Sequence, residues 1–233
     1  TKGVQYLKDN FKVPAIIGPR GAARTKVAYE ALDSADILLI SPSATSIELT
    51  GLDNPAPSAD NPGLLWRTAA PDSLQGRALP TDMLARADRP KRMGPMRRNA
   101  NIEVREFGFN TDPAEQVGTS LTDTEIDEFR FISSSSELIS NYLTALSVSG
   151  SLGERTIFLT DAAFNQKLFS SNTSVQAIYP KIRGTAPARS AGAVFNIFAS
   201  AMSAEYDFDV GSSGFAPHAF DASWLVLYGL AWA

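Results

Sequence analysis

Short and nearly uninterrupted apolar runs, each leading into a helical stretch, constrain the fold of this 233-residue chain more than any other feature. Five such runs are Val13–Ile17, Ile37–Ile40, Leu64–Arg67, Phe129–Ile132 and Thr156–Leu159. Strands that are apolar on both faces, rather than alternating, are typical of a parallel sheet covered by helices. Because parallel neighbours need a long crossover, we expect right-handed β–α–β units and a doubly wound α/β fold.

The segments between these runs predict the covering helices. We expect helices over residues 22–35, 72–87, 137–148, 193–206 and 218–233. In the first four, apolar residues recur at helical spacing and mark the faces that we expect to be buried. These residues are Ala23, Val27, Ala31 and Ala35 with Leu32 beside them; Leu74, Ala78 and Leu79; Leu138, Tyr142, Ala145 and Leu146; and Phe195, Phe198, Met202 and Tyr206.

Composition excludes several classes of function. A formal net charge of −4 and a pI near 5.1 leave no basic footprint for nucleic acid. The absence of cysteine excludes disulfides and thiolate metal sites. The single histidine, His218, cannot build a common zinc site or a catalytic triad alone, so we expect it to face solvent or to cap a helix. No apolar run approaches the roughly 20 residues of a membrane span. An enzyme such as a hydrolase would need a base beside a nucleophile, and the sequence shows no such pair, so we expect no enzyme and no cofactor.

Three polar segments interrupt the alternation of strands and helices. Residues 52–62 are rich in proline, aspartate and asparagine and predict a surface loop. Residues 86–98 are strongly basic and predict a solvated linker, with a phosphate or lipid-headgroup patch as the alternative. Residues 122–128 are acidic, but Glu128 stands where a calcium-binding EF-hand loop needs glycine, so we expect a solvated turn.

Small residues and hydroxyl groups follow the first two apolar runs. The first run ends in GPRGAARTK (18–26) and the second in SPSATS (41–46). In open parallel sheets ligands bind at the carboxyl ends of the strands, where unpaired N–H groups of the next helix favour an anion. The hydroxyl groups can line such a cleft, or they can cap the following helix. Both interpretations stay open, as does a ligand-packing or a buried role for Trp66. The spacing of a phosphate-binding loop is absent.

Three stretches resemble one family of proteins. They are Gly18-Pro19 after the first run, the SPSAT run followed by Glu48, Leu49 and Thr50, and LLWRTAAPDSLQG (64–76) with Trp66, Arg67, Thr68, Asp72, Gln75 and Gly76. The family is that of the type I periplasmic solute-binding proteins, the receptors of ABC importers for leucine and other branched-chain amino acids. FLTDAAFNQKLF (158–169), IYPKIRGTAP (178–187) and AFDAS (219–223) follow in the family's order. The resemblance is strong over residues 13–80 and looser over residues 125–233.

The resemblance implies two doubly wound parallel-sheet lobes with a ligand cleft between them. It implies ligand-binding residues at Gly21, Ala22, Ser43, Ala44 and Thr45 in the first lobe and at Ser134, Ser135 and Asp161 in the second. Amino-acid receptors of the family usually carry serine at the position of Ala22, where the hydroxyl holds the ligand carboxylate, so this donor is lost here. Backbone groups of residues 43–45 and the Thr45 hydroxyl would bind carboxylate and ammonium, and Asp161 lies near the acid that pairs with the ammonium.

The same resemblance suggests how the chain is divided. We expect residues 1–87 to form the first part of lobe 1, residues 88–100 a basic linker or crossover, residues 101–184 lobe 2, and residues 185–233 return helices that pack on lobe 1. The family has further segments before residue 1, around residues 92–100 and after residue 233. We therefore expect the chain to be incomplete at both ends, processed or trimmed from a longer one.

The function implied by the resemblance is capture of a small carboxylate-bearing ligand, an amino acid or a relative, for the permease of an ABC transporter. The protein would be bacterial and periplasmic or anchored in the cell envelope, and a lipid anchor on an N-terminal segment missing from this sequence fits the same family. No nucleic acid is expected as a partner. The alternative is an envelope lipoprotein or a sensor domain of the same fold that binds a protein partner, which a large exposed apolar patch would favour.

Overall fold

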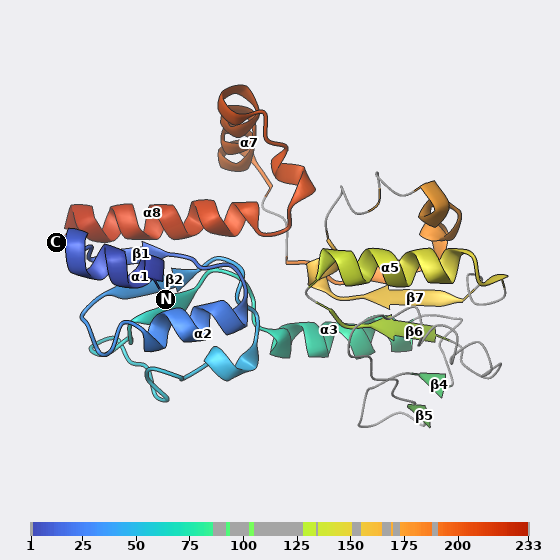
Figure 1. Cartoon of the computed structure of the whole chain (residues 1–233), viewed down its shortest axis with the longest axis horizontal. Coiled ribbons are helices and arrows are strands. Elements are labelled where there is room, and N and C mark those ends of the chain that lie inside the picture. Colours follow the sequence, from blue (N-terminus) through green and yellow to red (C-terminus); the bar gives the residue numbers. More distant parts are fainter. Residues whose placement is uncertain are drawn as a thin grey trace. The chain divides into compact units, whose positions relative to one another are not determined.

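The computed structural model describes residues 2–85, 92–93, 103–104, 128–133, 135–150, 155–164, 169, 173–187 and 191–232. Contacts within the chain divide it into two compact units (Figure 1). Unit 1 comprises Thr1–Arg77, Arg189–Val210 and Phe215–Ala233, and unit 2 comprises Ala78–Ala188 and Gly211–Gly214. The lobe boundaries expected from the sequence stay predictions.

Unit 1 is built on a parallel sheet with the strand order β1-β2-β3. Its strands lie within one or two residues of the first three apolar runs and are β1 (Ala15–Ile17), β2 (Leu38–Ser41) and β3 (Leu65–Arg67). Its helical elements are α1 (Lys2–Tyr6), the π turn η1 (Leu7–Phe11), α2 (Ala22–Glu30), the 3-10 turn η2 (Ile47–Leu49), the first part of α3 (Asp72–Ala85), α7 (Ala193–Tyr206) and α8 (Ala216–Trp232). Figure 1 shows α2 and α8 on opposite sides of β1 and β2, which gives the doubly wound arrangement that the sequence predicted.

The core of unit 1 lies between α2 and the sheet. Ile16, Ala28, Leu32, Ile37 and Leu39 form one buried cluster. The predicted buried face of α2 was wrong in part: Leu32 is buried as expected, but Val27 is 47% exposed and Ala23 is exposed as well. The observed face consists of residues 25, 28 and 32, which are also at helical spacing. Its first member, Thr25, is polar, and its hydroxyl is buried only because it is hydrogen-bonded.

Unit 2 contains a parallel sheet with the strand order β5-β4-β6-β7-β8. Its strands are β4 (Arg92–Met93), β5 (Glu103–Val104), β6 (Glu128–Phe131), β7 (Thr156–Leu159) and β8 (Ile182–Gly184). Its helical elements are the second part of α3, α5 (Ser136–Ser147) and the 3-10 segments η4 (Asp161–Ala163) and η5 (Thr173–Lys181), while η6 (Val210–Ser212) lies at the boundary between the units. The predicted buried face of α5 is confirmed: Leu146 is fully buried, and Tyr142 stacks on Phe131 with ring centroids 4.2 Å apart.

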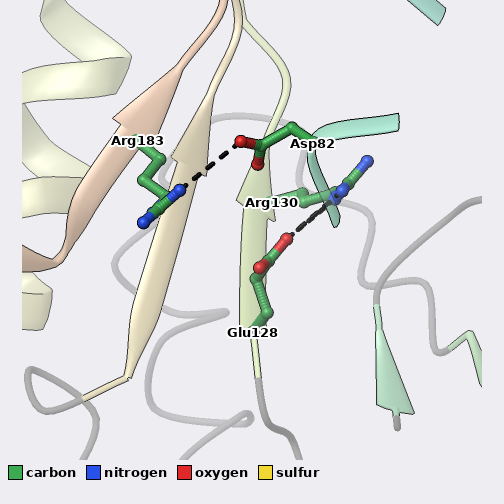
Figure 2. Close-up of polar contacts among 4 residues, drawn as sticks. All are labelled: Asp82, Glu128, Arg130 and Arg183. Atoms are coloured by element: carbon green, nitrogen blue, oxygen red, sulfur yellow. Dashed lines mark hydrogen bonds and ion pairs between the residues drawn. The ribbon is translucent and has the colours of Figure 1, made fainter. Parts of the chain in front are cut away.

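One face of this sheet carries charged side chains that the sequence did not lead us to expect (Figure 2). Glu128 and Arg130 lie two residues apart on β6 and therefore share a face, with Arg130 Nη2 3.2 Å from Glu128 Oε1. Their side chains are 1% and 5% exposed, so the carboxylate is tolerated in the interior because it is paired. The expected solvated turn was thus wrong at Glu128, and residues 122–127 lie outside the described part of the chain. On β8, Arg183 Nη1 lies 3.5 Å from Asp82 Oδ1 of α3.

Other expectations about surface segments had mixed outcomes. The surface loop over residues 52–62 is confirmed, and the Asp53 carboxylate closes it by accepting hydrogen bonds from the backbone N–H groups of Leu64 and Leu65. Within the predicted basic linker, Arg92–Met93 form strand β4, because their backbone pairs with two neighbouring strands whatever their side chains are. The remaining residues of that linker lie outside the described ranges.

The two C-terminal helices are unusually exposed. The predicted packing of α7 through its aromatic stripe was wrong, because no side chain of α7 is buried and Tyr206 is 73% exposed. The stripe instead continues onto α8, where Phe198 stacks on Phe220 with ring centroids 4.3 Å apart. Leu74 on α3, also expected to be buried, is 50% exposed. We use the name α8 apolar face for the exposed side chains of Trp224, Leu225, Leu227, Tyr228, Leu230 and Trp232.

The described residues contain neither a membrane-spanning helix nor a cluster of metal-binding side chains. No helix in this part of the chain combines the length and the apolar character needed to cross a bilayer. In the same residues, no cluster of three or more histidine, cysteine or acidic side chains is arranged to hold a metal ion.

Candidate functional site

The loops that follow β1, β2 and β3 meet at the carboxyl edge of the unit 1 sheet. Gly21, which precedes the first residue of α2, donates its backbone N–H to the Ser43 hydroxyl oxygen at 3.1 Å. The Gly21 backbone has φ +83°, a conformation that glycine adopts without strain. Gly21, Ala22 and Ser43, all predicted site residues, are therefore brought together at one corner. We call the segment of residues 41–46 the β2 loop.

A buried pair of hydroxyl groups, those of Thr25 and Ser41, lies next to this corner. Thr25 and Ser41 are fully buried, and their hydroxyl oxygens lie 3.1 Å apart. Ser41 donates to the backbone carbonyl of Pro19 at 2.9 Å, and Thr25 Oγ1 lies 2.9 Å from the carbonyl of Gly21 and 3.3 Å from that of Pro19. These contacts tie the loop after β1 to the end of β2 and to the first turn of α2.

The β2 loop is also fastened to β3 and the start of α3 through its backbone carbonyls. The backbone N–H of Thr68 donates to Ser41 O at 3.3 Å, and that of Asp72 donates to Thr45 O at 2.8 Å. Arg67 Nη1 donates to Ser46 O at 2.7 Å, and Arg67 Nη2 contacts the Thr50 hydroxyl. Burial lowers the pKa of the Arg67 guanidinium, with Asp72 acting in the opposite direction.

The four hydroxyl groups of the β2 loop have different roles. Ser41 and Ser43 bond to the loop after β1, and Ser46 caps η2 by accepting the backbone N–H of Glu48 at 3.2 Å. The Thr45 hydroxyl has no hydrogen-bond partner among the described residues, and its side chain is half-buried. Helix capping, one of the two interpretations of this hydroxyl run, is confirmed for Ser46, while cleft lining stays a prediction.

A small pocket opens beside the β2 loop. It has a volume of about 20 Å³, room for about one water molecule. Its lining residues come from α2, the β2 loop, η2 and β3 and are Thr25, Ser41, Ala44, Leu49, Leu65, Trp66 and Arg67. Ala44 is fully buried there, so its side chain packs under the loop. Trp66 is 38% exposed, which contradicts the buried alternative for this residue.

His218 of α8 contacts the segment that follows β3 at the carboxyl edge of the unit 1 sheet. The Thr68 hydroxyl donates to the backbone carbonyl of His218 at 2.7 Å. The expectation of a solvent-facing histidine was wrong, because its Nε2 atom is buried and has no hydrogen-bond partner in the described structure. Burial lowers the pKa of the His218 imidazole, while Asp221 and a hydrogen bond with the backbone of Thr68 act in the opposite direction.

The predicted residues of the second lobe fall in unit 2. Ser135 is the N-cap of α5 and accepts the backbone N–H of Leu138 at 3.3 Å, so its hydroxyl is used in capping. Asp161 follows β7 as the first residue of η4, and its side chain is half-buried. Both residues follow neighbouring strands of one parallel sheet at its carboxyl edge. Ser134 lies outside the described residues.

Solved structures with the same arrangement of elements are ABC-transporter substrate-binding proteins. The branched-chain amino acid transporter protein LivJ from Streptococcus pneumoniae, in complex with isoleucine, matches 97% of this chain and 66% of its own at 19% identity and a TM-score of 0.70. The leucine-binding protein LivK from Thermotoga maritima matches 99% of this chain and 67% of its own at 14% identity and a TM-score of 0.70. A solute-binding protein from R. palustris, in complex with benzoate, matches 96% and 63% at 14% identity and a TM-score of 0.67.

The chain has the fold of the type I periplasmic binding proteins. This confirms the fold that the sequence predicted, and the chain spans about two thirds of the length of these structures. No protein-family model and no curated protein matches the sequence. At identities below 20%, the similarity concerns the fold, so the ligand and the site residues remain to be argued from the geometry.

Proposed function

We propose that the chain is the ligand-capturing part of an extracytoplasmic solute-binding protein that serves an ABC transporter permease. The fold supports this proposal, since proteins of this fold with known ligands carry small molecules such as isoleucine, leucine and benzoate. The observation that carries it is the β2 loop. Three of its carbonyls are bound by the neighbouring segment, and one of its hydroxyl groups, that of Thr45, is left uncommitted at the carboxyl edge of a parallel sheet.

The chemistry of this corner suits a small carboxylate. Ser43 Oγ accepts the N–H of Gly21, so the proton of the same hydroxyl can be donated elsewhere. Together with the Thr45 hydroxyl it would supply two neutral donors to a carboxylate near the first turn of α2, whose dipole favours an anion. Ala22 has no hydroxyl group. The Ser43 hydroxyl would replace the serine donor that amino-acid receptors of the family usually carry at the position of Ala22. In unit 2, Ser134, Ser135 and Asp161 are the proposed ligand contacts, with Asp161 pairing with a ligand ammonium.

Calorimetric titration of the full-length protein tests this proposal. Leucine, isoleucine and benzoate are the probes, because the similar structures contain them. We expect heat of binding from at least one probe and a loss of affinity of about tenfold in Thr45→Val, which removes one donor at constant shape. Ser46→Ala is the matched control, since that hydroxyl caps η2 and points to Glu48. Absence of heat from all three probes removes the carboxylate-receptor proposal.

A variant of Asp161 provides a second experiment, which distinguishes amino-acid ligands from other carboxylates. Asp161→Asn should weaken leucine and isoleucine, which carry an ammonium group, and should leave benzoate unchanged. Equal losses for all three probes would show that Asp161 supports the fold of η4 and does not pair with the ligand.

A protein-binding role on the same fold is the second candidate, and the α8 apolar face favours it. Six large apolar side chains of α8 are between 43% and 94% exposed. Aromatic side chains on a face with little charge are typical of the centre of protein interfaces. An envelope-anchored lipoprotein or sensor domain would use this face for a partner.

The absence of cysteine makes this second candidate easy to examine. Tyr228→Cys in this 233-residue chain provides a single thiol on the α8 apolar face for a fluorescent label. If the face is covered by a partner, a water-soluble quencher should reach the label less in an envelope fraction than in buffer. A label that stays equally accessible in both, in a protein that binds one of the three probes, favours transport over partner binding.

A further inference from the structure

We infer that Arg67 is a positioning residue for ligand binding, which acts by holding the β2 loop in the orientation that aims the Thr45 hydroxyl. This inference rests on the proposed function and adds a residue to it that no comparison assigns. Arg67 is the last residue of β3, and its guanidinium reaches two groups of the segment that follows β2, namely Ser46 O and the Thr50 hydroxyl. It therefore joins the end of one strand to the loop of its neighbour.

The position of these contacts along the loop decides what they control. Two consecutive carbonyls that follow the Thr45 Cα are held, since its own accepts from Asp72 N at 2.8 Å and that of Ser46 accepts from Arg67 Nη1 at 2.7 Å. On the other side of Thr45, the carbonyl of Ser41 accepts from Thr68 N at 3.3 Å. Threonine is branched at Cβ, so its hydroxyl direction follows the backbone closely. A loop whose carbonyls are fixed on both sides of residue 45 therefore presents the Thr45 hydroxyl in few directions.

Arg67 suits this task better than a neutral donor would. A charged donor makes a hydrogen bond about twice as strong as a neutral one, and the planar guanidinium can bind two acceptors at once. The Arg67 side chain is half-buried and lines the small pocket under the loop, where water competes less for its N–H groups. The backbone donors Thr68 and Asp72 come from the same segment, so Arg67 is the one side chain among these three anchors.

Removing the guanidinium should loosen the β2 loop without unfolding unit 1. In Arg67→Ala, Ser46 O loses its charged donor, while Thr45 O and Ser41 O keep theirs. The loop should then sample more orientations, and the ligand must restrict them again on binding. We expect an affinity about tenfold weaker for whichever of leucine, isoleucine or benzoate binds the unmodified full-length protein. Arg67→Lys keeps the positive charge but loses the planar guanidinium that binds two acceptors. Its affinity for the probe should therefore lie between those of the unmodified protein and Arg67→Ala.

A double-mutant cycle with Thr45→Val separates positioning from general support of the fold. If Arg67 acts through Thr45, Arg67→Ala should cost little affinity in the Thr45→Val background, because the hydroxyl that it aims is already gone. The matched control is Lys26→Ala, which removes one positive charge from the exposed side of α2. Independent losses, multiplying in the double variant, would overturn the inference.

Hydrogen exchange on the protein without ligand provides a readout that does not depend on the proposed function. Arg67→Ala should speed up amide exchange about tenfold in peptides covering residues 41–50 and leave peptides of unit 2 unchanged. Unchanged exchange in residues 41–50 overturns the inference even if the protein binds a probe. If exchange rises as expected while no probe binds, Arg67 still holds the loop and it is the proposed ligand class that fails.

Discussion

The buried hydroxyl pair of Thr25 and Ser41 gives the sharpest prediction about stability. Either hydroxyl can serve the carbonyl of Pro19, because Ser41 Oγ lies 2.9 Å from it and Thr25 Oγ1 lies 3.3 Å from it. In Thr25→Val the serine still donates to Pro19, and the Gly21 carbonyl keeps the backbone N–H of Thr25 at 3.1 Å. In Ser41→Ala the threonine can turn toward Pro19. Each single variant therefore leaves no carbonyl without a donor.

The expected free energies follow from this count of donors. Each single variant loses one net hydrogen bond, which costs about 1 kcal/mol of unfolding free energy. Threonine and valine have similar helix propensities, so the change at residue 25 adds little through α2 itself. The double variant also leaves Pro19 O without either hydroxyl, and an unpaired, partly buried acceptor costs about 1 kcal/mol more. The double variant should therefore lose more stability than the sum of the two singles.

Urea unfolding followed by tryptophan fluorescence measures these differences in unit 1 alone. All three tryptophans, at positions 66, 224 and 232, belong to unit 1. Thr45→Val is the matched control, because that hydroxyl has no partner among the described residues and its loss should change stability by less than about 0.5 kcal/mol. A double variant that is additive or milder, or a Thr45→Val variant as unstable as Thr25→Val, would refute the assignment of these hydroxyl groups.

Three further predictions concern other parts of the chain. Burial lowers the pKa of His218, so the unfolded chain takes up a proton more readily than the folded one. The free energy of unfolding should therefore fall as the pH drops below about 6.5. Urea titrations of His218→Gln at several pH values should lack this fall. Leu143 is 1% exposed in the core of unit 2, so Leu143→Ala should lose about 2 to 5 kcal/mol in far-UV circular dichroism melts of that unit. Asp82→Asn should cost less than about 1 kcal/mol in the same melts, because both partners of the Asp82–Arg183 pair are nearly half exposed.

The sequence predicted the elements of the fold well wherever apolar residues alone determined them. Strands β1, β2, β3, β6 and β7 lie within one or two residues of the five apolar runs, although β6 also carries the charged Glu128 and Arg130. Strand β4 was missed because its two residues, Arg92 and Met93, pair through their backbone and carry no apolar pattern. Strand β5, Glu103–Val104, was missed for the same reason.

The buried faces were predicted less well, and polar residues explain the errors. On α2, the polar Thr25 lies on the buried face, while the apolar Val27 faces outward. On β6, Glu128 is buried against Arg130. A pattern of apolar residues cannot reveal such positions, because the energetic cost of burying them is offset by partners that are distant in sequence or known only from the structure.

The hydroxyl run after β2 shows how far the site could be predicted. Sequence patterns indicated that residues 41–46 lie at the carboxyl edge of the sheet, and the structure agrees, but four similar hydroxyl groups could not be told apart. Their roles depend on partners that come from other segments: Pro19 and Gly21 from the loop after β1, and Glu48 from η2. Three hydroxyl groups are thereby bonded within the fold, although Ser43 only accepts and keeps its proton to donate, and the Thr45 hydroxyl alone has no partner among the described residues. Arg67 was noticed as part of a family motif but not as an anchor, because the contact that gives it this role, with Ser46 O, spans 21 residues of sequence.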